Sequence, residues 1–310
     1  MRTTRSLVLL TLLAVGCGSS SSPSDAAISE AGTFGEAGSL ADAGGSTVDL
    51  GGATEAGAQA SYCTAKPVLA SVTDLTGVWV AKLTGAQIVT SALTKPIHNE
   101  NVYYQLLTIQ QTGTAITVDG RYCDRTEVND PSASVPVEIP DAWAHTETPI
   151  HRTGDFTPGS GGYSVLNLPT LFEAIGARLT SADTLPTGTD DSRVYDEDND
   201  GNPGITIHLS GLVTGNVYSV QAQTTSILAI PVSANRVEGS LAFTSNQTVL
   251  ASSPSAIKAL YESSKTAADF AVCASTFVMV KLAGLDGGAV DGGSDMSCTQ
   301  IRADEAKLFQ

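Results

Sequence analysis

The chain has 310 residues, of which 32 are acidic and 16 are basic, so its formal net charge is −16. This charge repels nucleic acid and anionic lipid surfaces, and we therefore expect no nucleic-acid partner. The length suffices for one large folded domain in addition to targeting and linker segments.

Residues 1–16 have the composition of a secretory signal peptide. Two arginines precede the apolar segment 7–15, which is too short for a membrane-spanning helix of about 20 residues. Ala14-Val15-Gly16-Cys17 resembles the lipobox of bacterial lipoproteins. The resemblance implies that a diacylglycerol is joined to the Cys17 thiol and that residues 1–16 are removed. Ordinary cleavage after the small residues Ala14-Val15-Gly16, without a lipid, is the alternative.

Residues 17–60 form the next segment, which is rich in Gly, Ala and Ser. It contains no Lys or Arg and few large apolar residues, so it cannot bury enough surface to offset the entropy cost of ordering. We predict a disordered acidic tether here, with residues 61–310 as a β-rich extracytoplasmic domain. Within the lipoprotein resemblance, Gly18 in place of an Asp implies delivery to the outer membrane, on its periplasmic or its surface face.

Apolar and polar residues alternate with a period of two through much of residues 61–310, which is typical of half-buried strands. We expect strands near residues 76–84, 86–91, 101–111, 116–122, 163–168, 205–210, 218–222, 225–232, 237–243 and 274–282. Thr112-Gly113 is expected to form a tight turn, and short helices are expected from Pro254 to Tyr261 and from Pro169 to Arg178.

These elements predict an all-β fold with minor α content. The expected architecture is a single antiparallel barrel or sandwich of roughly eight to ten strands, with long loops at 128–160 and 183–204. Gly77-Val78-Trp79 is similar to the Gly-x-Trp motif that opens lipocalin barrels, although Lys281 stands where that family has an Arg in its last strand. The alternative is that Trp79 only fills a core.

The chain has five cysteines. Lipidation of Cys17 leaves Cys63, Cys123, Cys273 and Cys298, an even set that can form two disulfides in an oxidising compartment. Three pairings are possible. We expect Cys123 with Cys273 and Cys63 with Cys298, because the second bond would join the two ends of one domain.

The strongest local motif is Asp196-Glu197-Asp198-Asn199-Asp200-Gly201-Asn202-Pro203-Gly204. The alternate carboxylates of Asp196, Asp198 and Asp200 can turn toward one cation, Gly201 permits the positive φ that the turn requires, and the carbonyl of Asn202 would supply a fourth ligand. The motif resembles the first half of EF-hand and thrombospondin-type calcium loops. The resemblance implies a structural Ca²⁺.

Further oxygen ligands for this cation must come from elsewhere, and Asp190 and Asp191 are the candidates. Between residues 183 and 200 seven carboxylates accompany the single Arg193, and without a cation they repel one another. The alternative is a solvated acidic loop without a fixed ion. The expected Ca²⁺ affinity is that of extracellular modules, about 10⁻⁴–10⁻³ M.

Catalytic motifs do not stand out in the sequence. It has no G-x-S-x-G elbow and no Walker or dinucleotide glycine pattern, and His145 and His151 do not have the spacing of zinc ligands. His208 is expected on a solvated strand face. Trp143 is expected to be a packing residue, with exposed stacking on sugars as its alternative.

The layout as a whole resembles surface lipoproteins of Gram-negative bacteria, which implies a location but no activity. Our first hypothesis is a non-enzymatic binding or interaction module that is anchored to the membrane by its lipid and rigidified by calcium and disulfides. Its partner would be an unidentified extracytoplasmic ligand or protein. The alternatives are a lipocalin-like carrier of a small apolar ligand and a hydrolase of envelope or extracellular polymers.

Overall fold

The computed structural model describes residues 72–91, 94–140, 142–147, 149–159, 163–271, 273–282 and 294–310, without the side chains of residues 91, 94, 145 and 294–297. All of them belong to one compact unit, Leu50–Gln310. The expected signal peptide, the lipidated Cys17, the tether and Cys63 lie outside the described residues.

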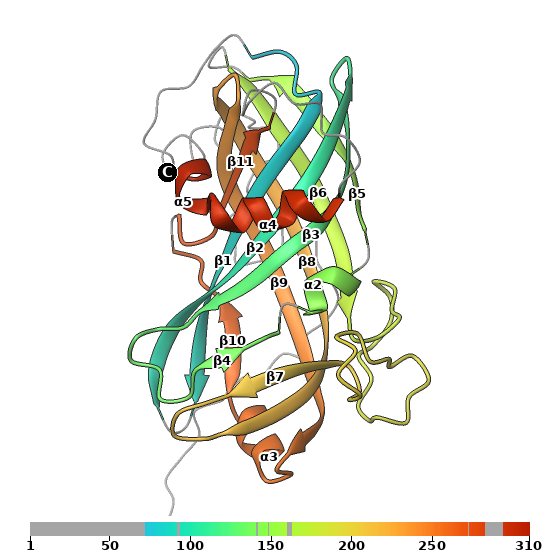
Figure 1. The fold of residues 1–310 in the computed structure, drawn as a ribbon, viewed down its shortest axis with the longest axis vertical. Coiled ribbons are helices and arrows are strands. Elements are labelled where there is room, and N and C mark those ends of the chain that lie inside the picture. The colour runs from blue at the N-terminus through green and yellow to red at the C-terminus, as the bar shows by residue number, and fades with distance from the viewer. Residues whose placement is uncertain are drawn as a thin grey trace, which may run out of the picture. The chain divides into compact units, whose positions relative to one another are not determined.

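Eight antiparallel strands close into an up-and-down barrel (Figure 1). Each strand pairs with the next one along the chain, β8 pairs with β9, and the last strand pairs back with the first. The all-β prediction is therefore confirmed, and of its two architectures the chain adopts the barrel. The barrel strands are β1 (Gly77–Ser91), β2 (Thr94–Thr112), β3 (Ala115–Val128), β5 (Ile150–Pro158), β6 (Ser164–Ile175), β8 (Gly215–Ser233), β9 (Arg236–Ser253) and β11 (Thr276–Lys281).

Smaller elements surround this ring. Strand β7 (Ile205–Leu209) pairs with β8 and with the short β4 (Val137–Glu138), while β10 (Lys265–Ala268) pairs with β1. The helices are α2 (Ala142–Thr146), α3 (Ile257–Glu262), α4 (Ser294–Ala303) and α5 (Glu305–Leu308), and Figure 1 shows α4 crossing the strands of the barrel wall. Among the described helices none has the length and apolar character needed to cross a bilayer.

The tight turn predicted at Thr112-Gly113 forms one residue later, at Gly113-Thr114 between β2 and β3, with Gly113 at φ +63°. The predicted helix that ends near Tyr261 is confirmed as α3. The loop expected at 128–160 is wrong in part, because it contains β4, α2 and β5. These three elements are too short or too polar to show a clear period in the sequence.

The helix predicted from Pro169 to Arg178 is wrong, because this segment continues strand β6 as far as Ile175 and is not helical beyond it. Leu166, Leu168 and Ile175 point into the barrel, and pairing with β8 continues on both sides of a register shift between Leu168 and Leu171. A proline lacks the N–H that a strand ladder needs, but it is tolerated at such an irregularity. Long-range pairing with β8 thus outweighs the helix-start signal of the proline.

One half of the barrel interior is filled by apolar side chains. Trp79 is fully buried at the start of β1 and donates its Nε1–H to the carbonyl oxygen of Leu75 at 2.7 Å. The ammonium of Lys281, from the last barrel strand, lies 5.5 Å from the Trp79 ring centre, within the range of a cation–π contact. The neighbouring interior positions are apolar and buried; they include Ala81, Leu83, Leu107, Ile109, Val118, Leu166, Phe277 and Met279.

The other half of the interior, beneath α2, contains buried charged groups among its apolar side chains. Arg125 and Glu127 of β3 form a buried ion pair at 2.8 Å, and the Arg125 guanidinium stacks on the rings of Tyr103 and Trp143 at 5.1 and 5.4 Å. Trp143, on α2, is only 1% exposed, so it packs the core as expected and offers no surface for sugars. The barrel therefore has an apolar half around Trp79 and a half beneath α2 in which an ion pair is buried against aromatic side chains.

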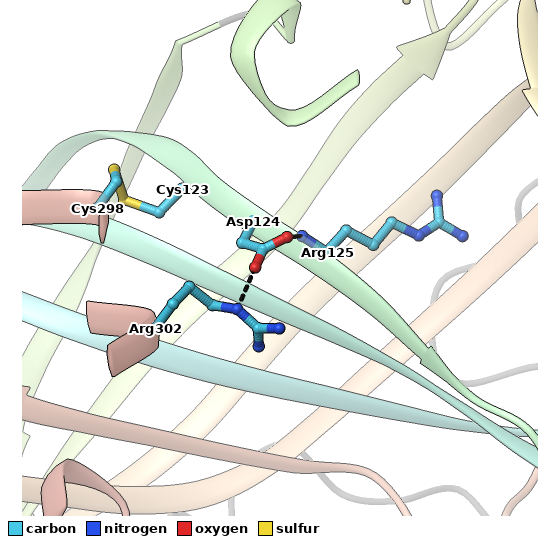
Figure 2. Close-up of a disulfide and its surroundings, with 5 residues drawn as sticks. All are labelled: Cys123, Asp124, Arg125, Cys298 and Arg302. Carbon is cyan, nitrogen blue, oxygen red and sulfur yellow. Dashed lines mark hydrogen bonds and ion pairs between the residues drawn. A yellow bond between two sulfur atoms is a disulfide. The ribbon is translucent and has the colours of Figure 1, made fainter. Parts of the chain in front are cut away.

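The C-terminal helices pack on the outside of the barrel and are held there by a disulfide. Cys123 of β3 is bonded to Cys298 of α4, and Figure 2 shows the ion pair between Asp124 and Arg302 beside that bond. Ile301 of α4 is buried against the outer apolar residues of β1 and β2. The side chain of Arg125 points away from this contact (Figure 2).

The expected pairings of Cys123 with Cys273 and of Cys63 with Cys298 are both wrong, since Cys123 bonds to Cys298. Cys273 is also disulfide-bonded. The sequence could not show the Cys123–Cys298 pairing, because this pairing depends on which side of the barrel helix α4 packs against. Cys123 is the extra residue of a bulge in β3, between the residues that pair with Tyr104 and Gln105, and it belongs to the same outer apolar cluster as Ile301.

Candidate functional site

The Asp196–Asp200 segment forms a tight loop just before β7, as predicted. One carboxylate oxygen from each of Asp196, Asp198 and Asp200 lies within 4.8 Å of the others, in an arrangement that could hold a metal ion. Gly201 has φ +86°, the positive value expected for it, and Asn199 has φ +57°, which Asn tolerates. The alternation of carboxylates in the sequence thus becomes a convergence of three carboxylates in space.

Hydrogen bonds hold two of these aspartates in place. Asp196 accepts the backbone N–H groups of Asp200 at 3.1 Å and Gly201 at 2.8 Å. Asp200 accepts bonds from the backbone and the side chain of Asn202 and from the hydroxyl of Thr206. The loop is therefore tied to the first residues of β7 before any ion is considered.

Asp198 differs from its two neighbours because it is buried. It is 5% exposed, and its Oδ2 accepts the backbone N–H of Thr206 at 2.7 Å. Its other oxygen, Oδ1, is buried and has no hydrogen-bond partner among the described residues. Burial, together with the charges of Asp200 and Asp196, raises the pKa of Asp198 to about 6. A buried carboxylate oxygen without a donor is costly unless a cation or proton neutralises it.

The further ligands expected from the loop are placed as follows. Asn202 lies beside the group, with its side chain on Asp200. Asp191 forms two hydrogen bonds with the Arg193 guanidinium, at 3.0 and 2.7 Å, which lower its pKa to about 2. Asp190 is not part of the three-aspartate group. The described residues thus supply three carboxylates, and a role of Asp190 or Asp191 as a ligand stays a prediction.

The residues that alternate with these aspartates, Tyr195 and Glu197, make their contacts on the opposite side of the loop. Glu197 is 1% exposed and accepts the backbone N–H of Gly176, at the end of β6. It also makes side-chain hydrogen bonds with Glu147 and Tyr195, and burial raises its pKa. Alternate residues of one short segment therefore face two sites, with Asp196 and Asp198 on the cation side and Tyr195 and Glu197 on the other.

Tyr195 lines a cavity of about 570 Å³ at the barrel wall. This size lies in the range of small-molecule sites, about 300–1,000 Å³. The cavity lies between the start of β5 and the end of β6, and its walls are partly apolar, from Ile150, Leu171 and Phe172, and partly charged, from Glu147, Glu173 and Arg178.

The cavity exists because β5 and β6 separate. Their pairing is confined to Asp155–Pro158 with Ser164–Asn167, and it stops where Pro169 would have to donate an N–H. Across this gap the Arg152 guanidinium of β5 donates to the carbonyl oxygens of Leu168 at 3.2 Å and Pro169 at 2.8 Å. A buried arginine thus replaces the missing ladder bonds and leaves the space beside it open.

Glu173 lies on the inner side of this cavity. Its carboxylate accepts hydrogen bonds from the hydroxyl of Tyr122 and from the amide of Gln223, and burial raises its pKa. His151, which also lines the cavity, pairs instead with Asp119 at 2.6 Å on the outer face. His208 is exposed, as expected, and contacts Asn216 at 2.8 Å.

The chain matches no protein-family model, no curated protein and no solved structure. The interpretation of the site therefore depends on its geometry alone. Sequence reasoning missed the cavity residues Glu147, Glu173 and Tyr195 and the neighbouring Arg152. The one signal that could have found part of the set is the alternation within the Asp-rich loop, which places Tyr195 and Glu197 opposite the aspartates.

Proposed function

We propose that this protein is an extracytoplasmic binding module in which Ca²⁺, held by Asp196, Asp198 and Asp200, fixes one wall of a ligand cavity. The observation that carries the proposal is the buried Oδ1 of Asp198, which has no donor among the described residues and faces two further carboxylates. Carboxylate oxygens are among the ligands that Ca²⁺ prefers. Because Tyr195 and Glu197 belong to the same segment, a cation on one side would hold the cavity wall on the other.

The location is part of the same proposal. The lipobox at Cys17 and the acidic tether would place the barrel outside the cytoplasm, anchored to the outer membrane by a lipid. The disulfide bonds of Cys123, Cys298 and Cys273 support an oxidising compartment. Extracytoplasmic spaces also supply the roughly millimolar calcium that a site with a Kd of about 10⁻⁴–10⁻³ M requires.

A lipocalin-like carrier is the second candidate, and a specific observation favours it. The chain forms a closed eight-stranded barrel with Trp79 buried at the start of its first strand and Lys281 of the last strand over the Trp79 ring. The apolar half of the interior is filled by side chains, however. A carried ligand would therefore occupy the cavity between β5 and β6, rather than the barrel axis.

Calcium titration of the full chain tests the proposal. Cys17→Ala allows purification without detergent, and isothermal titration should then show one Ca²⁺ site, with a melting temperature that falls in chelator. Asp198→Asn should abolish the heat of binding. Asp183→Asn is the matched control, because Asp183 is an exposed aspartate at the start of the same loop whose carboxylate accepts its hydrogen bonds from Thr180, and it should leave Ca²⁺ binding unchanged. Absence of Ca²⁺ heat together with unchanged melting in chelator would remove the calcium site.

A further inference from the structure

We propose that the cavity between β5 and β6 binds a small organic amine, with its apolar body on the strand side chains and its ammonium group on the carboxylates of Glu147 and Glu173. This inference rests on the proposed function, because it names the ligand class of the same cavity. It follows from three features of the cavity: its volume, its division into an apolar and an acidic part, and the nature of the groups that bond its acids.

The apolar part comes from both strands at the gap. Ile150 of β5 and Leu171 and Phe172 of β6 line the cavity, and Pro149 precedes them. A hydrocarbon body of one ring or a short chain would bury its surface here, at about 25 cal/mol for each Å² removed from water. The volume of about 570 Å³ accommodates a ligand of this size.

The acidic part comes from Glu173, which accepts hydrogen bonds from neutral donors, and from Glu147, which shares a side-chain hydrogen bond with Glu197. Glu173 is bonded by a tyrosine hydroxyl and by the amide of Gln223, while Glu197, behind Tyr195, is bonded by the backbone N–H of Gly176. Hydrogen bonds of this kind position a carboxylate, but they do not neutralise its charge. Burial raises the pKa of Glu173, because the cost of burying its charge exceeds what these hydrogen bonds and the charge of Arg152 return.

The two arginines near the cavity make their hydrogen bonds and ring contact elsewhere, although the charge of Arg152 also acts on Glu173 and lowers its pKa. Arg152 gives its hydrogen bonds to the carbonyl oxygens of Leu168, Pro169 and Thr225 and to the Thr225 hydroxyl. Arg178 lies over the ring of Tyr195, with its guanidinium carbon 4.9 Å from the ring centre. A ligand ammonium would therefore supply positive charge to the acidic side of the cavity, whereas a ligand carboxylate would meet two acids there.

Three probes of nearly equal size test the inference: 2-phenylethylamine, 2-phenylethanol and 3-phenylpropionate. Isothermal titration into the full Cys17→Ala chain should show the amine binding at least tenfold more tightly than the alcohol or the acid. Glu173→Gln and Glu147→Gln should each weaken amine binding about tenfold. Glu262→Gln is the control, because Glu262 lies on α3 in a surface ion pair with Lys258, and it should change nothing.

Ca²⁺ is also titrated into each sample. The heat of Ca²⁺ binding reports on the folded loop and on the proposed calcium site, whereas the probe titrations report on the ligand class. A variant that keeps its Ca²⁺ heat is folded at the loop beside the cavity. Equal binding of the three probes, preference for the acid, no binding of any probe, or amine binding unaffected by both glutamate variants would each overturn the inference. Loss of the Ca²⁺ signal in wild-type protein would instead overturn the proposed calcium site, whatever the probes show.

Discussion

Replacement of Asp198 by Asn should stabilise the protein without calcium, and calcium should narrow this difference because it stabilises wild type alone. Asn has nearly the same shape and retains an oxygen to accept the backbone N–H of Thr206, so the substitution changes mainly the charge. The burial that isolates Oδ1 makes this charge costly in the metal-free protein. The same negative charge would attract a bound cation, so the Asn variant should lose Ca²⁺ binding.

The magnitude follows from two quantities. A carboxyl pKa of about 6 in the folded chain, against an ordinary value of 3.8, corresponds to a destabilisation of about 3 kcal/mol at most when the group is ionised. The cost is fully present above pH 6, shrinks as the pH falls from 6 to 4, and is absent below 4, where both states are protonated. At 10 mM Ca²⁺ and a Kd of about 10⁻⁴–10⁻³ M, binding would return about 1.4–2.7 kcal/mol to wild type alone.

Thermal melting at pH 8 measures the cost of the Asp198 charge in EDTA and the stabilisation by Ca²⁺ in 10 mM Ca²⁺. Each kcal/mol shifts the melting temperature of a domain of this size by about 2–4 °C. The Asp198→Asn variant should therefore melt several degrees above wild type in EDTA and gain nothing from Ca²⁺. The reasoning is refuted if the variant melts below wild type in EDTA at pH 8, or if Ca²⁺ raises the melting temperature of both proteins equally.

Three further changes have defined outcomes. Cys298→Ala opens the bond to Cys123, which spans 175 residues, and should lower the free energy of unfolding in urea by up to about 5 kcal/mol; Cys123→Ala should have the same effect, and an unchanged urea midpoint would contradict the disulfide. Glu173→Gln should raise the melting temperature at pH 8 and not at pH 4, because burial raises the pKa of this carboxyl and its charge destabilises the fold only above its unfolded pKa; an equal effect at both pH values would rule out this cause. Trp79→Ala should cost about 3–5 kcal/mol in the same urea assay, and a loss below about 1 kcal/mol would show that the apolar half of the barrel is not organised around this ring.

Much of the barrel could be predicted from the sequence, because its strands alternate visibly. Ile116 and Val118 of β3, and Val237 and Leu241 of β9, are buried at the positions that a period of two assigns to one face. Closure of the ring could not be predicted in this way. It depends on the pairing of β11 with β1, and a period of two says which face is buried but not which strand is the neighbour.

The candidate site was predictable in its local part only. The convergence of Asp196, Asp198 and Asp200 follows from spacing and from the glycine that turns the chain. The burial of Asp198 depends on contact with Thr206 of β7, and the cavity depends on the separation of β5 and β6 at Pro169. The same proline suggested a helix start, because a local signal does not reveal a neighbouring strand.

The central claim, that a calcium ion at the Asp196–Asp200 loop supports the adjacent cavity wall, is tested most directly by crystallography with anomalous scattering from crystals grown in Ca²⁺. We predict one anomalous peak at about 2.3–2.6 Å from an oxygen of each of Asp196, Asp198 and Asp200. Crystals that diffract well but show no peak at this loop, or a peak that does not contact Asp198, would contradict the claim.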